Sequence, residues 1–254
     1  MRIALFSDIH ANLPALEAFF EDLAHQQADA VYCLGDLVGY NIWPNEVIRT
    51  IRNKGIPVIA GNYDAGIGIN SNDCGCAYKT EPEKEMGQLS ISFTNSIITV
   101  EERKYLAALP AHISIRYGTS QQQLHLLLVH GSPRKINEYL FEDREEKSLR
   151  RILEDAQADI CCFGHTHQPY HRVVASGENY FRHAVNIGSV GKPKDGDARG
   201  CYVILSIDEQ SSVADKESIG VEFIRFDYDV ETAANAIENS PLPNEYAEML
   251  RKGY

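Results

Sequence analysis

The sequence predicts an α/β fold, and three observations support this class. Short apolar runs alternate with amphipathic helical stretches over about the first sixty residues, a βαβαβ pattern that predicts a parallel sheet with right-handed crossovers. The second half holds more strands, in an order typical of antiparallel pairing. The chain has 254 residues, 44% hydrophobic and 24% charged, which suits a folded core and excludes disordered, collagen-like and coiled-coil classes.

The N-terminal elements follow from periodicity. Residues 2–7 form a short apolar run that predicts a buried strand, and 30–34 and 56–61 predict two more. Residues 13–27 predict an amphipathic helix with apolar side chains at spacings of three and four, and 43–55 predict a second one, with Pro44 in its first turn and Gly55 at its end.

The middle of the chain predicts a helical insertion at about 66–110. Residues 70–87 are polar and irregular, and a helical stretch follows near 86–98. Thr99 and Glu102 have the spacing of a capping box, which opens another helix through Leu109. Strands resume directly afterwards, so we expect one domain over 1–254.

The second half predicts a hairpin, a helix, several strands and two final helices. The hairpin is expected at 112–118 and 123–131, and the helix at 144–158. The remaining strands are expected at 159–164, 170–176, 180–188, 200–207 and 220–228, and the last helices at 230–240 and 243–253.

Net charge and hydropathy limit the classes of binding partner that are expected. The net charge of −12 argues against nucleic acid as a partner, but it leaves an anionic substrate open, because bound cations can dominate a local site. No apolar run approaches the ~20 residues of a membrane span, so no membrane partner is expected. Asp8 interrupts the N-terminal apolar run too early for a signal peptide, so a cytoplasmic location is expected.

The six cysteines do not predict a disulfide framework in a chain of this length. Four lie in apolar runs and are interpreted as small buried hydrophobes: Cys33, Cys161, Cys162 and Cys201. Cys74 and Cys76 lie in the polar loop. As a C-x-C pair they bind a soft metal or sense redox state in one interpretation, and have no function in the other.

Polar side chains follow five successive predicted strands. Singly they have ordinary explanations: a carboxylate or amide caps a helix or ends a turn, and a histidine is satisfied in the core. Together they would converge, because ligands bind at the carboxyl ends of strands in open α/β sheets, and burying such groups unpaired is costly. Cations are the simplest partners for these groups, which are Asp8, His10, Asp36, Asn62, His130, His165 and His167.

This set exceeds the needs of one tetrahedral zinc ion. It suits two divalent metal ions that share a bridging carboxylate. Oxygen and nitrogen donors without thiolate favour Mn²⁺, Fe, Zn²⁺ or Mg²⁺ over soft metals.

The order of motifs resembles the calcineurin-like metallophosphoesterase superfamily. The motifs D-x-H, G-D-x-x-G, G-N-x-D, H-G and G-H-x-H run from Asp8 to His167, and 185–197 resembles the N-P-G-S-V-G segment of its bacterial branch of small phosphoesterases. The resemblance implies a two-sheet mixed β-sandwich flanked by helices, the metallo-dependent phosphatase fold. It also implies two metal sites that share Asp36, one with Asp8, His10 and His167 and the other with Asn62, His130 and His165.

The implied activity is metal-dependent hydrolysis of a phosphoester, a monoester or a diester, of a small soluble phosphorylated substrate. Two metals ~4 Å apart generate hydroxide at neutral pH and neutralise charge in the transition state. Mn²⁺ is the ion expected to support activity in vitro. The candidate catalytic residues are His10, Asn62 and Tyr63. Asn12 and Lys192 are phosphate contacts in one interpretation, and a helix-start residue and a solvated lysine in the other.

Two departures from the family pattern bear on the activity. Tyr63 stands where the family commonly has histidine, and a phenol of pKa ~10 is a mismatched acid near neutral pH. We therefore expect slow turnover of poor leaving groups. Residues 39–41 lack the aspartate and arginine usual in the Ser/Thr phosphatases and dinucleoside-tetraphosphate hydrolases, which counts against those substrates.

The alternative function is a catalytically weak or inactive scaffold of this fold that binds a protein partner, since such a protein tolerates a change like Tyr63. The complete set of predicted ligands favours the enzyme. A nuclease shares the chemistry but fits the acidic charge poorly. Residues 66–87 and 134–143 are expected to shape the substrate pocket.

Overall fold

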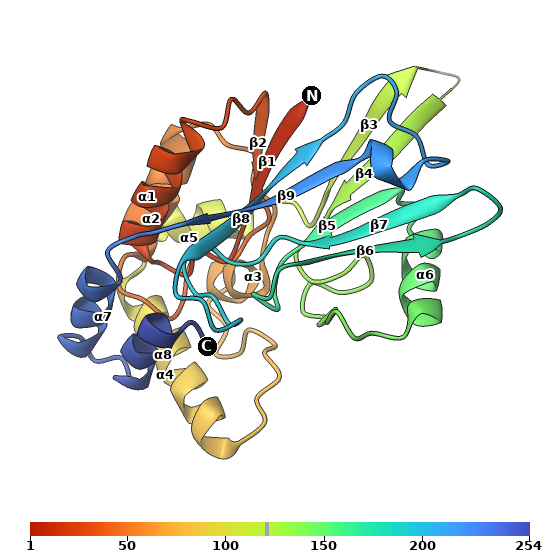
Figure 1. Ribbon diagram of the computed structural model, residues 1–254. Coiled ribbons are helices and arrows are strands. Elements are labelled where there is room, and N and C mark those ends of the chain that lie inside the picture. Colours follow the sequence, from red (N-terminus) through yellow and green to blue (C-terminus); the bar gives the residue numbers. More distant parts are fainter. Residues whose placement is uncertain (120–121) are drawn as a thin grey trace.

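Two mixed β-sheets form the centre of the fold in the computed structural model, which describes residues 1–119 and 122–254 (Figure 1). The first sheet has the order β2-β1-β8-β9, with β1 at Arg2–Phe6, β2 at Ala30–Cys33, β8 at Gly200–Ser206 and β9 at Gly220–Phe226. The second has the order β3-β4-β5-β7-β6, with β3 at Ile113–Thr119, β4 at Gln122–Leu128, β5 at Ile160–Phe163, β6 at Tyr170–Ala175 and β7 at Phe181–Asn186.

Each sheet contains a parallel part. β1 and β2 are parallel in the first sheet, and β4, β5 and β7 are parallel in the second. The other pairs, including the predicted β3–β4 hairpin, are antiparallel. The α/β class and the two-sheet sandwich flanked by helices are thereby confirmed.

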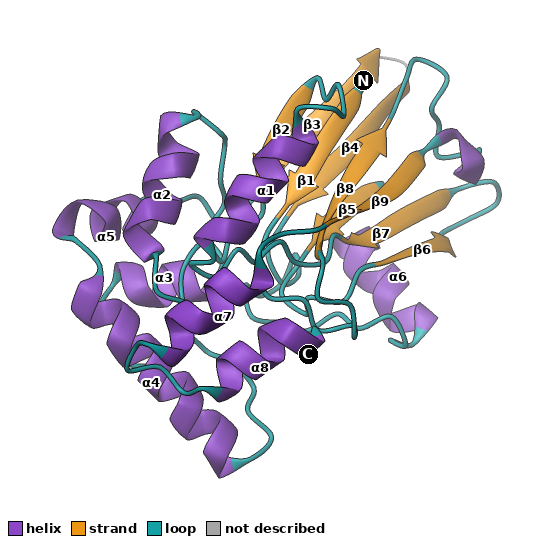
Figure 2. Ribbon diagram, turned by 60° about the vertical axis from the view of Figure 1, so that its left-hand side comes forward, coloured by secondary structure: helices purple, strands orange, loops and turns teal. Residues whose placement is uncertain are grey.

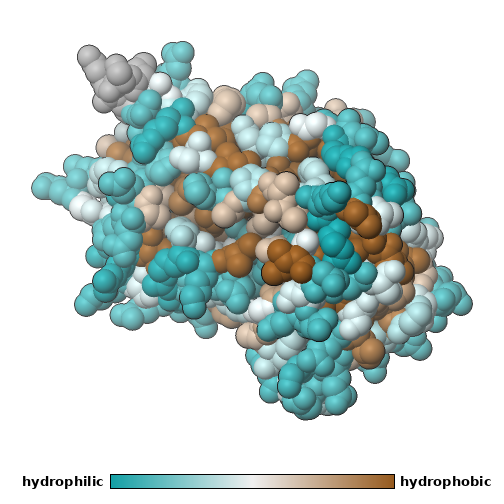
Figure 3. Space-filling view, turned by 180° about the vertical axis from the view of Figure 1, so that it is seen from behind, coloured by the Kyte–Doolittle hydropathy of each residue, from teal (hydrophilic) through white to brown (hydrophobic). Residues whose placement is uncertain are grey.

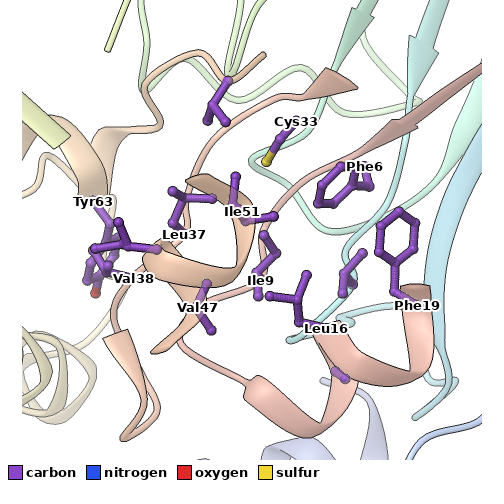
Figure 4. Packing of buried hydrophobic residues seen from close by; sticks show 14 of the residues in the cluster. Phe6, Ile9, Leu16, Phe19, Cys33, Leu37, Val38, Val47, Ile51 and Tyr63 are labelled. Carbon is purple, nitrogen blue, oxygen red and sulfur yellow. The ribbon is translucent and has the colours of Figure 1, made fainter. Parts of the chain in front are cut away.

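Helices cover the outer faces of both sheets. α1 (Leu13–Leu23) and α2 (Pro44–Asn53) lie against the first sheet and α6 (Glu146–Asp155) against the second (Figure 2). Successive side chains of β1 point to opposite faces of the sheet and so join the helical layer to both sheets. Ala4 and Phe6 pack in a cluster with α1 and α2, whereas Ile3 and Leu5 pack between the two sheets. The Phe6 ring stacks on Phe19 of α1 with centroids 4.3 Å apart (Figure 4).

The remaining helices gather near the carboxyl ends of the parallel strands (Figure 1). They are α3 (Asn62–Gly68), α4 (Glu81–Ile97), α5 (Val100–Ala107), α7 (Val230–Glu238) and α8 (Glu245–Lys252), and a 3₁₀ turn spans Lys216–Ser218. The Thr99 side chain accepts a hydrogen bond from the Glu102 backbone at the start of α5, as its spacing predicts. α5 ends at Ala107, two residues before the expected Leu109.

The expectation of a third strand at 56–61 is wrong. This segment makes a single parallel bridge, between Val58 and Cys33. Pro57 has no N–H to donate, and the Ala60 N–H bonds to the Pro110 carbonyl instead of to β2. The chain then enters α3, a helix that its glycine-containing sequence did not predict.

Hydrophilic side chains predominate on the face shown in Figure 3, with hydrophobic ones in small groups between them. Within the described part of the chain, no helix has the length and apolar character needed to cross a membrane.

Candidate metal centre

The loops after β1 and β2 are held together by backbone hydrogen bonds. The Asp8 N–H donates to the Gly35 carbonyl at 2.9 Å and the His10 N–H to the Asp36 carbonyl at 3.0 Å. The segment after β7 closes on the same loop, where the Ser189 hydroxyl donates to the Asp8 carbonyl at 2.7 Å. These contacts fix the ends of three strands from two sheets against one another.

Six of the seven predicted ligands form two buried triads. Asp8, His10 and His167 form one, and Asp36, His130 and His165 the other, with the ligand atoms of each triad within 4.8 Å of one another. In the first triad, His167 Nε2 lies 3.2 Å from Asp8 Oδ1 and 3.2 Å from His10 Nε2. The structure thus brings residues 157 to 159 positions apart into one cluster.

Asp36 belongs to the second triad and also approaches the first. Its Oδ2 is 3.4 Å from His130 Nε2 and 3.6 Å from His10 Nε2. The seventh predicted ligand, Asn62, starts α3 and places its Oδ1 3.2 Å from His130 Nε2. The Asn62 Nδ2 group donates to the Cys74 carbonyl at 2.8 Å, which leaves Oδ1 as the atom turned toward the triad.

Backbone carbonyls orient three of the imidazoles. Nδ1 of His10 lies 2.9 Å from the Val38 carbonyl and Nδ1 of His130 lies 2.8 Å from that of Leu34. His167 makes the same contact with the Lys192 carbonyl. A proton on each Nδ1 leaves the Nε2 lone pair facing the centre, which is the arrangement of metal-ligating histidines.

Hydrogen bonds to one oxygen hold each of the two carboxylates, Asp8 and Asp36, in place. Asp8 Oδ2 accepts hydrogen bonds from the Ser7 hydroxyl and from the His165 N–H, and Asp36 Oδ1 accepts one from the Tyr63 N–H at 2.8 Å. The other oxygen of each, Asp8 Oδ1 and Asp36 Oδ2, faces the imidazoles. Gly61 permits this approach, because a Cβ there would lie 2.0 Å from Asp36 Oδ1.

Backbone strain is concentrated at the same residues. Five of the predicted ligands adopt left-handed backbone angles, with φ between 50° and 65°: Asp8, His10, Asp36, His165 and His167. Non-glycine residues seldom adopt this conformation, and where they do it is frequent at functional sites. The strain is offset by the backbone hydrogen bonds between the loops.

Electrostatics favour the metal-binding protonation states of Asp8, His10 and His165, but not that of His130. Burial lowers the pKa of His10 and of His165 to about 3, so both rings are neutral at pH 7. Burial opposes ionisation of Asp8, but His167, His130 and His10 together outweigh burial and lower the Asp8 pKa. At His130, burial lowers the pKa, but Asp36, Asp8 and the Leu34 carbonyl together outweigh burial and raise the pKa to about 10. A proton must therefore leave this ring before it can bind a cation.

Two buried atoms of the centre have no hydrogen-bond partner within residues 1–119 and 122–254. They are Asp8 Oδ1 and His165 Nε2. Burying a polar atom unsatisfied is costly, and a divalent cation at each triad would satisfy both. The nitrogen and oxygen donors therefore fit two borderline or hard divalent metals.

Other predicted residues take defined places. Asn12 caps α1 by accepting from the Ala15 N–H, which agrees with its interpretation as a helix-start residue. Lys192 is buried, at 3% exposure, so it is not a solvated lysine. Tyr63 is buried in the cluster of Figure 4, and its hydroxyl has no hydrogen-bond partner among the described residues. Burial raises the pKa of Tyr63 well above its ordinary value.

The cysteines are all free thiols. Cys33, Cys161, Cys162 and Cys201 are buried, as their apolar surroundings predict. Cys76 is half-buried, and its Sγ lies 3.4 Å from Asn62 Nδ2.

Three side chains that lie beside the centre were not predicted from the sequence as site residues. Ser7 supports Asp8, the Tyr40 ring lies 4.8 Å from the His10 ring, and the Tyr139 ring lies 4.1 Å from the His165 ring. Tyr139 falls in the segment 134–143 that was expected to shape the pocket. Ser7 carries no sequence signal beyond its position next to Asp8.

Comparison with known proteins agrees with these motifs. Residues 1–210 match the model of the calcineurin-like phosphoesterase superfamily domain. An uncharacterized protein of Methanocaldococcus jannaschii is 30% identical over 264 aligned residues, which cover 99% of this chain and 98% of that protein.

Two solved structures cover the whole of this chain. A metallophosphoesterase from Sphaerobacter thermophilus is 27% identical, with a TM-score of 0.74 and 99% of its own chain covered. A hypothetical protein from Pyrococcus horikoshii is 22% identical, with a TM-score of 0.79 and 98% of its own chain covered, and shares the fold.

Proposed function

Because the chain belongs to the calcineurin-like phosphoesterase superfamily, we propose that it is a dinuclear metal-dependent phosphoesterase acting on a small soluble substrate. The observation that carries the proposal is the position of Asp36 Oδ2, 3.4 Å from a histidine of its own triad and 3.6 Å from a histidine of the other. A carboxylate oxygen in that position can serve two cations at once.

The residues that would hold the metals divide by triad. Asp8, His10 and His167 would hold one, His130, His165 and Asn62 the other, and Asp36 both. Two divalent cations supply a water of lowered pKa as nucleophile and positive charge for the phosphoryl oxygens. The protein's own contribution is orientation, because backbone carbonyls fix three imidazoles and one oxygen of each carboxylate is tied by hydrogen bonds.

The proposed acid step is weak in this chain. The family's usual histidine is replaced by Tyr63, whose raised pKa makes proton donation to a leaving group unfavourable near pH 7. Leaving groups that are stable as anions, such as phenolates, need no such proton. The proposed enzyme therefore favours aryl over alkyl esters, and Mn²⁺ is the first metal to test.

The test combines metal content with turnover. Protein stripped by a chelator is loaded with Mn²⁺, Zn²⁺, Fe²⁺ or Mg²⁺, analysed for bound metal, and assayed on a 4-nitrophenyl phosphomonoester and a diester. We expect about two ions per chain and metal-dependent release of 4-nitrophenol. Asp36→Asn is expected to lose at least about 100-fold in kcat/KM, whereas the exposed Asp155→Asn on α6 serves as the matched control.

Two results would contradict the proposal. If the wild-type protein binds no cation, these residues do not form a metal centre. Protein that binds two ions but hydrolyses neither ester would favour the scaffold.

A further inference from the structure

A cavity of about 400 Å³ lies beside the candidate metal centre, a size typical of small-molecule sites. Segments far apart in the chain form it: the loop after β2, residues 76–86, the loop after β4, the segment after β7, and the C-terminal end with α8. Two of these segments, 66–87 and 134–143, were expected from their sequence to shape a pocket.

Residues of the cavity wall contact four of the predicted ligands. Tyr40 packs edge-on against His10, and Tyr139 lies over His165 at 4.1 Å between ring centroids. The two other contacts are Cys76 Sγ with Asn62 Nδ2 at 3.4 Å and the Lys192 carbonyl with His167 Nδ1. A phosphoryl group bound at the centre would therefore have its organic part next to this cavity.

Tyrosine is the commonest residue of the cavity wall. Five of the chain's 13 tyrosines line the cavity: Tyr40, Tyr78, Tyr139, Tyr246 and Tyr254. The Tyr40 and Tyr246 rings lie edge to face with centroids 5.2 Å apart. Met86 and Met249 add flexible, polarizable surface. Such a wall favours a flat ring over an alkyl group of similar size.

Lys192 and Lys194 of the cavity wall lack a matching carboxylate among the described residues. Lys192 is 3% exposed, and its Nζ lies 3.5 Å from Met249 Sδ and 5.0 Å from the centre of the Tyr40 ring. Within residues 1–119 and 122–254, no carboxylate oxygen lies within the 4.0 Å of an ion pair from Nζ of Lys192 or Lys194. The one carboxylate of the wall, Glu83, accepts a hydrogen bond from the Lys79 backbone N–H.

Burial disfavours the ammonium form of a lysine that has no anionic partner, and a ligand anion beside it would stabilise that form. We propose that this cavity is the substrate pocket, and that the substrate is a phosphoester with a planar aromatic group that carries a second anionic group. The ring lies among the tyrosines, and Lys192 with Lys194 meets the second anion. This inference rests on the proposed function, because the cavity is a substrate pocket only if the adjoining centre acts on phosphoesters.

The test measures binding and needs no turnover. Three phosphonates, which have no ester bond to hydrolyse, are titrated calorimetrically into Mn²⁺-loaded protein: cyclohexylphosphonate, phenylphosphonate and 4-carboxyphenylphosphonate. We expect phenylphosphonate to bind about 3- to 10-fold more tightly than cyclohexylphosphonate. The carboxylate should add about another 10-fold.

Variants assign each gain to its residue. Tyr246→Leu should remove the preference for phenyl over cyclohexyl, whereas Tyr32→Leu on β2 should keep it. Lys192→Met should remove the gain from the carboxylate, whereas the exposed Lys147→Met on α6 should keep it. Lys194→Met is the second variant, half-buried, in case the buried Lys192→Met does not fold.

The outcomes separate this inference from the proposed function. Equal affinity for the three phosphonates in protein that hydrolyses 4-nitrophenyl esters overturns the inference alone. If Lys192→Met and Lys194→Met weaken the binding of phenylphosphonate and of its carboxy derivative equally, the proposed contact of these lysines with a second anionic group is overturned. Protein that neither hydrolyses an ester nor binds any phosphonate overturns the proposed function, and this inference with it.

Discussion

Replacing Gly61 with alanine should disrupt the metal centre, although this change substitutes none of the predicted ligands. The backbone of Gly61 is extended, with φ −85° and ψ 174°, so alanine is allowed there. Its Cβ, however, would lie 2.0 Å from Asp36 Oδ1 and 2.2 Å from the Asp36 backbone nitrogen. Ordinary van der Waals contact begins at 3.4 Å, so the Asp36 carboxylate must move by more than about 1 Å.

A displacement of that size exceeds what a metal site tolerates, because ligand distances must hold within about 0.2 Å. It would also break the hydrogen bond from the Tyr63 N–H to Asp36 Oδ1, 2.8 Å long in the native chain. We expect Gly61→Ala to bind fewer than two ions, to lose at least about 100-fold in kcat/KM, and to lose about 1–3 kcal/mol in free energy of unfolding.

Elemental analysis and urea unfolding measure these effects. The matched control is Gly220→Ala in β9, where a Cβ would lie 3.2 Å from the Ser206 Cβ, a contact that needs a shift of only a few tenths of an ångström. If Gly61→Ala holds the same metal as wild type and turns over at the same rate, then the Asp36 carboxylate is not positioned as argued.

Three further predictions concern the acid, pH and the metal. Tyr63→His should raise kcat for alkyl esters by about 10- to 100-fold relative to aryl esters, because histidine supplies an acid of suitable pKa; an unchanged alkyl-to-aryl ratio counts against this role. Burial lowers the pKa of His183 to about 4 from the usual 6.5, so the unfolded chain binds more protons between these values and stability is lost as pH falls through this range. Between pH 7 and pH 5, the free energy of unfolding of the metal-free wild type, measured with urea, should therefore fall by about 2 kcal/mol more than that of metal-free His183→Gln. Equal losses in the two proteins would refute the assignment. Mn²⁺ at 100 times its Kd should stabilise the stripped protein by about 2.7 kcal/mol, seen as a rise in Tm that Asp36→Asn lacks; the same rise in Asp36→Asn would place the ion elsewhere.

Periodicity predicted most of the fold correctly. Continuous apolar runs gave β1, β2 and the strands of the second sheet, and apolar side chains at helical spacing gave α1, α2 and α6. α3 was missed because its seven residues include two glycines, which disfavour helix, and its position depends on tertiary contacts. The segment 56–61 is apolar like a strand, but the pairing that Pro57 and Ala60 make is not visible in composition.

The sequence also anticipated which side chains meet. The rule that ligands bind at the carboxyl ends of parallel strands predicted that Asp8, Asp36 and His130 meet, and the structure brings them together from two sheets; their role as metal ligands stays a prediction. The left-handed backbone at five of these residues was not foreseen, because non-glycine residues seldom adopt it. The cavity wall was foreseen only in part, because Tyr246 and Tyr254 reach it through the packing of α8.

The division of labour along the chain has an evolutionary consequence. Every predicted ligand lies between positions 8 and 167, inside the matched residues 1–210, whereas Tyr246, Met249 and Tyr254 come after that region. Mutations after residue 210 can therefore change one side of the cavity without altering a predicted ligand. Under the proposed function, preference for different esters can diverge among descendants of this chain with no change at the candidate metal centre.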